Sequence, residues 1–270
     1  MKAFYLIGSP VSHSLSPLMH NLAFRKLKLP YSYKLMEVKA SQLPEAVKAL
    51  RSPSVGGFNV TMPLKEAILE HLDEVSREAE AVGAVNTVAN VGGKLAGYNT
   101  DVAGVKAALE KAGVKASRAV VLGAGGAAKA AVYCLAELRA EVIVLNRTLA
   151  RARRLAERLP ATPVKLSRRA LREHIPRADL VVNATPVGMD GRSTLVDRSL
   201  LRRQQAVLDL VYRPLKTPLL REAEAAGAKC IPGVEVLVAQ GAEAFRIWTG
   251  FEPPVDEMMK AVVAELEGSS

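Results

Sequence analysis

The chain has 270 residues, of which 49% are hydrophobic, and its formal net charge is +10 at pH 7. This length suits one large domain or two ordinary ones, and the hydrophobic content is sufficient for a packed core. No apolar run approaches the roughly 20 residues of a membrane-spanning helix, and the N-terminus lacks the layout of a signal peptide. We therefore expect a globular, cytoplasmic protein.

The first hundred residues alternate between strand and helix patterns. Strands are predicted at Ala3 to Ile7, Ser32 to Val38 and Gly56 to Val60, and helices at Pro17 to Leu27, Ser41 to Leu50 and Leu64 to Leu72. Ser16 is expected to cap the first helix, with Pro17 at its first position. Val85 to Ala89 and Leu95 to Tyr98 flank two glycines and predict a hairpin. The alternation predicts an α/β domain with a mainly parallel sheet.

A glycine-rich turn follows the predicted bridging helix Val102 to Lys111. Ala119 to Leu122 has a buried-strand pattern, and Ala127 to Leu138 has a helical one. Gly123 allows a tight turn, Gly125 lets a pyrophosphate approach the backbone, and Ala128 permits close packing of helix on strand. The cofactor contacts predicted from this turn are Gly123, Ala124, Gly125, Gly126 and Ala127.

The next strand, Glu141 to Leu145, indicates which dinucleotide binds. It ends at Asn146-Arg147-Thr148, where an NAD site would carry an acidic residue for the ribose hydroxyls. Arg147 and Arg151 suit a 2′-phosphate, because guanidinium groups form charge-assisted hydrogen bonds with phosphate oxygens. We therefore predict NADP rather than NAD; the alternative is that both arginines are solvated side chains at a helix start.

The second half of the chain completes a Rossmann-type pattern. Strands are predicted at Pro163 to Leu166, Leu180 to Ala184 and Ala206 to Leu210, with a last one ending at Ile231-Pro232-Gly233. Helices are predicted at Pro218 to Ala226, Val234 to Trp248 and Val255 to Glu267. Cys134 and Cys230 are predicted to be reduced core residues, and no close Cys or His spacing suits zinc, so we predict no metal site.

Much of the positive charge is concentrated in one stretch of the sequence. Residues 147–177 carry ten Lys or Arg side chains against Glu157 and Glu173. Such a field would attract a polyanionic cofactor or a nucleic acid. The stretch has no aromatic side chains for base stacking and no recognisable nucleic-acid-binding motif, so we predict a small-molecule ligand and no nucleic-acid partner.

Polar residues gather where the loops leave the strands of the first half, which is where ligands bind in open α/β sheets. Asn59 and Asn86 are amides that need polar partners when buried. Lys65 and Asp101 are the charged residues of these loops that could transfer a proton to or from a reacting oxygen. An ordinary ion pair, or a lysine at a helix start, is the alternative for these two.

These residues lie in an ordered set of motifs that resembles the shikimate dehydrogenases over nearly the whole chain. The substrate-side motifs are Ser12 to Pro17, Gly57 to Lys65, Gly83 to Thr87 and Gly97 to Asp101. The cofactor-side motifs are Gly123 to Ala128, Asn146 to Thr148, Asn183 to Pro186, Asp209 to Tyr212 and Val238 to Gln240. Glu235 and Val236 depart from the family pattern, in which a second glycine and a methionine are commoner.

The resemblance implies NADPH-dependent reduction of 3-dehydroshikimate to shikimate, with Lys65 as principal acid/base and Asp101 as its partner. It implies substrate contacts from Ser14, Ser16, Asn59, Thr61, Asn86, Tyr212 and Gln240. Further cofactor contacts are implied for Asn146, Arg147, Thr148, Arg151, Thr185 and Gly233.

The implied architecture is two α/β domains with a cleft between them. Residues 1–101 plus 236–270 form the substrate-binding domain and 102–235 the NADP-binding Rossmann domain, and the protein is expected to be a monomer or homodimer. Two other functions stay open: a quinate/shikimate dehydrogenase of broader specificity, and a non-catalytic dinucleotide-sensing or nucleic-acid-binding protein.

Overall fold

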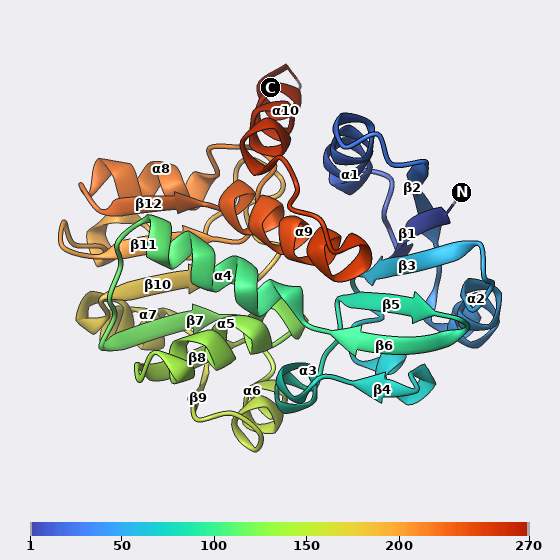
Figure 1. Ribbon diagram of the computed structural model, residues 1–270. Coiled ribbons are helices and arrows are strands. Elements are labelled where there is room, and N and C mark those ends of the chain that lie inside the picture. Colours follow the sequence, from blue (N-terminus) through green and yellow to red (C-terminus); the bar gives the residue numbers. More distant parts are fainter. Residues whose placement is uncertain (1, 269–270) are drawn as a thin grey trace. The chain divides into compact units, whose positions relative to one another are not determined.

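The computed structural model describes residues 2–268, which form two compact units (Figure 1). The first unit contains residues 2–100 and 238–262, and the second contains residues 101–237 and 263–268. Each unit is an α/β arrangement built on its own six-stranded sheet.

The first unit has a mixed sheet in the order β2-β1-β3-β5-β6-β4. Its strands are β1 (Lys2–Gly8), β2 (Tyr31–Glu37), β3 (Val55–Val60), β4 (Glu74–Val75), β5 (Thr87–Val91) and β6 (Lys94–Tyr98). Its helices are α1 (Ser16–Lys26), α2 (Leu43–Leu50) and α3 (Arg77–Val82), with short 3₁₀ segments η1 (Ala40–Gln42) and η2 (Ala67–His71). Strands β1, β2 and β3 are parallel, whereas β5 runs antiparallel to both of its neighbours.

Two apolar groups hold the first unit together. Aliphatic side chains from β3, α2 and the hairpin, among them Val60, Val47 and Leu95, pack into one cluster. An aromatic cluster joins β1, β2 and α1 to the end of α9 (Gly233–Thr249), and it contains Phe4, Phe24, Tyr31, Tyr33, Phe245, Trp248 and His20. The C-terminal part of α9 is therefore part of the core of this unit.

The second unit has an all-parallel sheet in the order β12-β11-β10-β7-β8-β9. Its strands are β7 (Arg118–Leu122), β8 (Glu141–Asn146), β9 (Thr162–Lys165), β10 (Leu180–Asn183), β11 (Ala206–Asp209) and β12 (Lys229–Pro232). Its helices are α4 (Thr100–Lys111), α5 (Gly126–Glu137), α6 (Leu149–Ala156), α7 (Arg168–His174), α8 (Pro218–Ala225) and the end of α10 (Val255–Gly268), with η3 (Ile175–Arg177) and η4 (Arg198–Leu200). Helices α4 and α5 lie over the sheet face that is turned toward the viewer in Figure 1.

Most predicted elements are confirmed, including the strand, turn and helix around Gly123 and the hairpin of β5 and β6. Three details are wrong. Residues 64–72 form no α-helix but the short 3₁₀ segment η2. Ser16 is the first residue of α1 rather than its cap, because Leu15 takes the cap position. Cys230 is exposed, since it lies on the edge strand β12, whereas Cys134 is buried as predicted.

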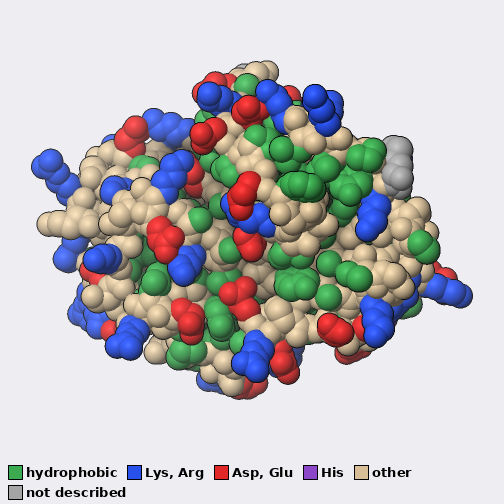
Figure 2. All heavy atoms as spheres, in the orientation of Figure 1, with side chains coloured by type: hydrophobic (Ala, Val, Ile, Leu, Met, Phe, Trp, Pro, Cys, Tyr) green, Lys and Arg blue, Asp and Glu red, His purple; other side chains and the backbone are tan. Residues whose placement is uncertain are grey.

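Charge is distributed without a single-sign patch on the face shown in Figure 2, where Lys and Arg side chains alternate with Asp and Glu. The ten basic residues of 147–177 are all exposed. Within residues 2–268, no helix is long and apolar enough to cross a membrane, and no group of three or more His, Cys, Asp or Glu side chains could hold a metal ion.

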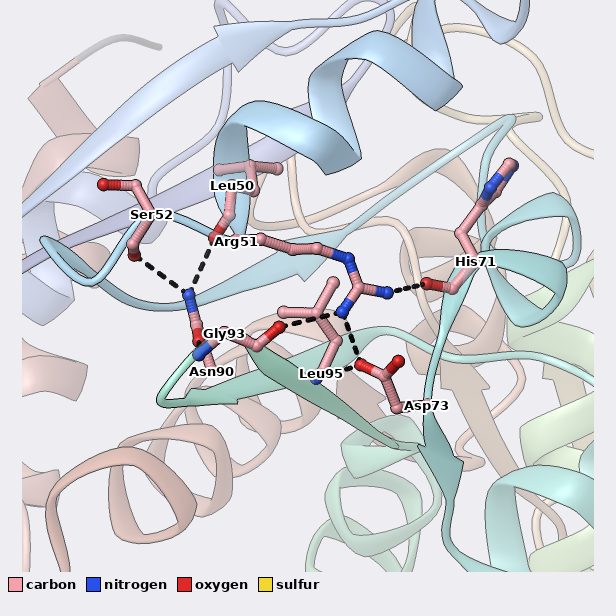
Figure 3. A network of polar contacts seen from close by, with 8 residues as sticks. All are labelled: Leu50, Arg51, Ser52, His71, Asp73, Asn90, Gly93 and Leu95. Carbon is pink, nitrogen blue, oxygen red and sulfur yellow. Dashed lines mark hydrogen bonds and ion pairs between the residues drawn. The ribbon is translucent and has the colours of Figure 1, made fainter.

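A charged network fixes the outer end of the β5–β6 hairpin (Figure 3). Arg51, after α2, donates to the Asp73 carboxylate at 2.5 Å, to the Gly93 carbonyl at 2.8 Å and to the His71 carbonyl at 3.0 Å. Asp73 also accepts from the Leu95 backbone N–H at 2.7 Å. The hydrogen bond from Arg51 is the main reason that the pKa of Asp73 is lowered. Apart from their contact with each other, Arg51 and Asp73 bond to backbone groups. The network therefore stabilises the fold of the hairpin.

Candidate functional site

The first unit contains a buried cluster of neutral polar side chains at the end of β3 and the start of β5. Asn59 donates from Nδ2 to the Asn86 carbonyl at 3.1 Å and to Thr87 Oγ1 at 2.9 Å. Asn86 Oδ1 accepts from the Thr100 backbone N–H at 2.7 Å and from the Thr87 hydroxyl at 3.1 Å. All four residues are at most 5% exposed. The predicted positions Asn59 and Asn86 are thus brought together.

Gln240 reaches the same cluster from α9. Asn86 Nδ2 donates to Thr100 Oγ1 at 3.0 Å and to Gln240 Oε1 at 3.4 Å, across 154 residues of sequence. The contact with Gln240 is the longer of the two, and Gln240 is only half-buried. The two predicted residues therefore lie side by side at the more exposed end of the cluster.

Ser14 and Ser16 form a second polar group, at the start of α1. The Ser14 hydroxyl donates to Ser16 Oγ at 3.2 Å, and the Ser16 backbone N–H donates to Ser14 Oγ at 3.2 Å. Ser16 is 6% exposed, and Ser14 is half-buried. These hydroxyls can donate to a carboxylate without bringing a cation to the site.

Thr61 and Lys65 lie in the loop that leaves β3. The Thr61 backbone N–H donates to the Ile7 carbonyl at 2.8 Å, which ties this loop to the end of β1. The Lys65 carbonyl accepts from the Val85 backbone N–H at 2.8 Å, so its main chain is held beside the start of the hairpin. Lys65 is half-buried, as is Asp101, which lies in the first turn of α4 and belongs to the second unit.

Sequence reasoning missed Tyr33 as part of the polar cluster. Its hydroxyl donates to Asn59 Oδ1 at 2.7 Å, and the residue is 2% exposed. On the sequence, Tyr33 is one of several aromatic residues in a strand, which is typical of a core position. A useful signal is the buried Asn59 amide itself, since its oxygen requires a donor.

The glycine turn of the second unit has the geometry of a phosphate-binding turn. Gly123 has φ of +113°, and a Cβ there would lie 2.8 Å from the Ala184 carbonyl oxygen, so only glycine fits. Gly125 takes the N-cap position of α5 and is exposed, with open space where its Cβ would be. A ligand can therefore approach the backbone at Gly125 and the helix start formed by Gly126 and Ala127.

The end of β8 carries the expected basic residues. Asn146 donates from Nδ2 to the Thr148 carbonyl at 2.8 Å and orders the turn into α6, whose N-cap is Thr148. Arg147 and Arg151 are both exposed, the latter in the first turn of α6. No acidic side chain occupies this turn, so a phosphate there would meet no like charge.

A buried carboxyl orders the loops after β10 and β11. Asp209 is fully buried and accepts from Asn183 Nδ2 at 2.8 Å and from the Thr217 hydroxyl at 2.6 Å. Burial raises the pKa of Asp209. Thr185 donates to Asn183 Oδ1 at 2.7 Å, so this predicted cofactor residue is held in place by the same network. Tyr212, three residues after Asp209, is half-buried.

Gly233 begins α9 where three backbone groups crowd together. A Cβ at this position would lie 2.6 Å from the Asp209 carbonyl oxygen and 2.7 Å from that of Val211. Packing alone therefore requires glycine here. Glu235 forms an ion pair with Lys111 of α4, with its two carboxylate oxygens 2.9 Å and 2.8 Å from the Lys111 Nζ.

Family models match three segments of the chain. Residues 6–88 match the shikimate dehydrogenase substrate binding domain, 106–205 the shikimate / quinate 5-dehydrogenase model and 233–263 the shikimate 5'-dehydrogenase C-terminal domain. Together these segments span most of the sequence and contain the glycine turn and the polar cluster residues Asn59 and Asn86.

Full-length relatives agree with these matches. The shikimate dehydrogenase (NADP(+)) of Pyrococcus abyssi is 45% identical, with 99% of each chain covered. A crystal structure of Thermus thermophilus shikimate 5-dehydrogenase in complex with NADP(H) and shikimate is 44% identical, with a TM-score of 0.89 and 97% of this chain and 98% of that chain covered. Quinate dehydrogenase from Corynebacterium glutamicum in complex with NAD is 32% identical, with a TM-score of 0.89 and 97% and 99% covered. The chain therefore belongs to the shikimate dehydrogenase family.

Proposed function

We propose that this chain catalyses the reversible, NADP-dependent interconversion of shikimate and 3-dehydroshikimate. The observation that carries the proposal is the convergence of Asn86 and Gln240, far apart in sequence, on one neutral polar cluster of the first unit. Amide and hydroxyl groups of this kind recognise a polyhydroxylated molecule by hydrogen bonds and reject analogues that leave them unpaired. The full-length relatives from Pyrococcus abyssi and Thermus thermophilus support the same reaction.

The proton chemistry is assigned to Lys65. In the reducing direction, the carbonyl carbon gains a hydride and its oxygen gains a proton from the Lys65 ammonium; in the reverse direction, neutral Lys65 removes the hydroxyl proton as the hydride leaves. Asp101 is assigned as its carboxylate partner. General acid/base catalysis of this type contributes roughly 10² to 10⁴ in rate.

The substrate contacts are divided by chemistry. Ser14, Ser16, Thr61 and Tyr212 are assigned to the carboxylate, because hydroxyls donate hydrogen bonds without competing for the transferred proton. Asn86 and Gln240 are assigned to the ring hydroxyls, since an amide both donates and accepts. Asn59 belongs to the same cluster, although its partners on the protein already use its amide.

The residues of the second unit fit NADP. The open backbone at Gly125 and the start of α5 suit the pyrophosphate, and the exposed Arg147 and Arg151 suit the 2′-phosphate. The remaining contacts are assigned to Gly123, Ala124, Gly126, Ala127, Asn146, Thr148, Thr185 and Gly233. When bound, NADP supplies the nicotinamide that accepts or returns the hydride.

A second candidate is a quinate/shikimate dehydrogenase of broader specificity that uses NAD. The observation in its favour is the similarity to the quinate dehydrogenase from Corynebacterium glutamicum. Against it, the turn after β8 carries Arg147 and no carboxylate for the ribose hydroxyls. The non-catalytic alternative would leave Lys65 and Asp101 without a role.

The deciding experiment measures initial rates of oxidation for shikimate and quinate with NADP and with NAD. Turnover with shikimate and NADP, at kcat/KM well above the other three combinations, is the expected result. Comparable turnover of quinate or with NAD would favour the broader enzyme. A folded sample without turnover in any combination would contradict both dehydrogenase proposals.

The domain roles are part of the proposal. Residues 1–101 plus 236–270 are assigned to substrate binding and 102–235 to NADP binding. A monomer or homodimer remains the predicted assembly, which light scattering would test. The cytoplasmic location also remains a prediction, and cell fractionation would test it.

A further inference from the structure

The carboxyl ends of β10 and β11 carry an amide paired with a carboxylate. Asn183 and Asp209 are the last residues of these neighbouring parallel strands and lie opposite each other in the register (Figure 1). Both residues are buried, and Asn183 Nδ2 donates to Asp209 Oδ1 at 2.8 Å. Ligands bind at this edge of an open parallel sheet, so the pair lies at the edge where the cofactor is proposed to bind.

Three donors converge on the Asp209 carboxyl. Besides Asn183 Nδ2, the Val211 backbone N–H donates to Oδ1 at 3.0 Å, and the Thr217 hydroxyl donates to Oδ2 at 2.6 Å. Burial raises the pKa of Asp209, whereas these hydrogen bonds lower it. All three donors suit a charged carboxylate, and hydrogen bonds to a charged acceptor are roughly twice as strong as neutral ones. Asp209 is therefore a firmly held acceptor for Asn183.

Asp209 determines which way the Asn183 amide faces. An ionised carboxylate can only accept, so the amide turns Nδ2 toward Asp209, and the same nitrogen donates to the Val187 carbonyl at 3.0 Å. Oδ1 of Asn183 then faces Thr185, where it accepts from the backbone N–H at 3.1 Å and from the hydroxyl at 2.7 Å. Thr185 Oγ1 accepts from the Val187 N–H at 3.2 Å. Residues 185–187 are thus fastened to the pair.

The segment fastened in this way borders the glycine turn. The Ala184 N–H donates to the Leu122 carbonyl at 2.9 Å, at the end of β7. A Cβ at Gly123 would lie 2.8 Å from the Ala184 carbonyl oxygen and 3.3 Å from Thr185 Cγ2. Ala184 and Thr185 therefore lie against the backbone of the turn, with no room for a side chain between them.

We propose that Asp209 is a positioning residue for the cofactor, which acts through Asn183 to hold Ala184 and Thr185 against the glycine turn. The inference rests on the proposed function. The turn and this segment then form one preset surface for the part of the cofactor that NADP and NAD share, whereas the arginines after β8 serve the 2′-phosphate alone. Asp209 itself is fully buried and acts through these residues rather than by contact with the cofactor.

Asp209→Asn keeps the shape of the side chain and removes its charge. We expect Kd for NADP and Kd for NAD, measured by calorimetry, to rise together by about tenfold, or about 1.4 kcal/mol, as a charge-assisted hydrogen bond becomes a neutral one. KM for shikimate should stay close to the wild-type value. The rise in Kd should not depend on salt, because Asp209 is buried, whereas contacts of exposed arginines are screened.

Asp179→Asn is the matched control. Asp179 lies at the other edge of the same sheet, directly before β10, and accepts from the backbone N–H groups of Ser117 and Arg118 at 2.8 Å and 2.9 Å. Its loss of charge should lower stability to urea but leave both Kd values unchanged. Wild-type Kd values in Asp209→Asn, or equal rises in the two variants, would overturn the inference while leaving the proposed function intact.

Amide hydrogen exchange reports on the segment without any cofactor. The N–H groups of Thr185 and Val187 bond to Asn183 Oδ1 and Thr185 Oγ1. In Asp209→Asn they should exchange about tenfold faster than in wild type, since local opening costs less. The Arg118 N–H, at the other edge of the sheet, should exchange as in wild type. Unchanged exchange at Thr185 and Val187 would contradict the role of Asp209 whether or not the chain binds NADP.

A double-mutant cycle tests the route through Asn183. Thr185→Val removes the hydroxyl that donates to Asn183 Oδ1. If Asp209 acts through this contact, Asp209→Asn should raise Kd for NADP by much less in the Thr185→Val background than in wild type. Equal fold-changes in both backgrounds would contradict the route. A folded wild-type chain that binds neither NADP nor NAD would overturn the proposed function and, with it, the cofactor role of Asp209.

Discussion

The two units prepare their binding groups in opposite ways. In the first unit, Asn59, Asn86 and Thr100 are buried and neutral, and protein partners orient them before any ligand arrives. In the second unit, Arg147 and Arg151 are exposed, and the backbone at Gly125 is open to approach. A carboxyl is buried there too, at Asp209, but it holds loops in place.

The difference follows from the chemistry of the two proposed ligands. A small polyhydroxylated ring is distinguished from its isomers by where its hydroxyls lie, so its partners must be placed before binding. A dinucleotide carries phosphate charge, which long-range attraction and backbone N–H groups recognise with less demand on side-chain placement. Variants of the buried amides Asn59 and Asn86 should therefore change shikimate parameters, and variants of Arg147 and Arg151 should change cofactor parameters and their salt dependence.

The largest expected effect is on chemistry, at Lys65. Lys65→Ala should lower kcat for shikimate oxidation by roughly 10² to 10⁴, because the proton acceptor is lost. NADP binding, measured by calorimetry, should be unchanged, since Lys65 lies in the first unit. Lys26→Ala is a suitable control, because Lys26 forms a surface ion pair with Glu257 at 2.9 Å in the same unit. Wild-type kcat in Lys65→Ala would remove Lys65 from the mechanism.

The next effect separates the two cofactors. Arg147→Ala should raise KM for NADP by about 10- to 100-fold, the range expected for hydrogen bonds to a charged group. KM for NAD should change little, because NAD lacks the 2′-phosphate. The loss should shrink as salt is added, since exposed charges are screened. Arg169 is another exposed arginine of this unit, and Arg169→Ala should leave both KM values unchanged. Equal effects of the two variants on KM for NADP would mean that the net positive charge of the unit, rather than Arg147 itself, attracts NADP.

The sequence predicts the glycine turn and the basic residues of the second unit better than it predicts the polar cluster of the first unit. The glycine turn and the arginines after β8 are local features, in which residue type and spacing along the chain determine the geometry. Gly123 illustrates this, because its positive φ is a property of the turn itself. The order of strands and helices is equally local, and most of it is confirmed.

The substrate side depends on contacts between distant segments. Nothing in the strand pattern around Tyr33 says that its hydroxyl meets an amide 26 residues further on. Likewise, Ser16 fits a helix cap by type, but its place one residue inside α1 follows from the preceding loop. The family resemblance pointed to Ser16, Asn59 and Gln240, whereas their arrangement required the fold.

A pH experiment tests how the buried ring of His20, which stacks on Tyr33, contributes to the stability of the first unit. Burial lowers the pKa of His20 from its usual 6.5 to about 3. The unfolded chain therefore binds a proton at this residue at a higher pH than the folded chain does. Stability from neutral His20 is fully present above pH 6.5 and is lost as the pH falls towards 3, by about 1.4 kcal/mol per pH unit.

His20→Phe should keep a ring against Tyr33 and remove this proton uptake. Urea unfolding at pH 7, 6 and 5 should show a shallower loss of stability with falling pH in the variant than in wild type. His71→Gln is the control, because this residue lies on η2 and is only half-buried, so its variant should follow wild type. If the free energy of unfolding falls equally with pH in wild type and in His20→Phe, His20 does not cause the loss of stability at low pH.

The smallest effect concerns Glu235, which forms a charge pair within the second unit. Its carboxylate contacts Lys111 Nζ at 2.8 Å, and the Lys111 side chain is 65% exposed. Exposed pairs contribute about 0 to 1 kcal/mol, and the start of α9 adds a favourable helix dipole. Glu235→Gln should therefore lower Tm by roughly 1 to 4 °C in low salt and by less at high salt. Glu110→Gln should lower it less, because Glu110 and Lys106 are 4.0 Å apart and both well exposed. A Tm loss that does not depend on salt would assign the effect of Glu235 to packing rather than to charge.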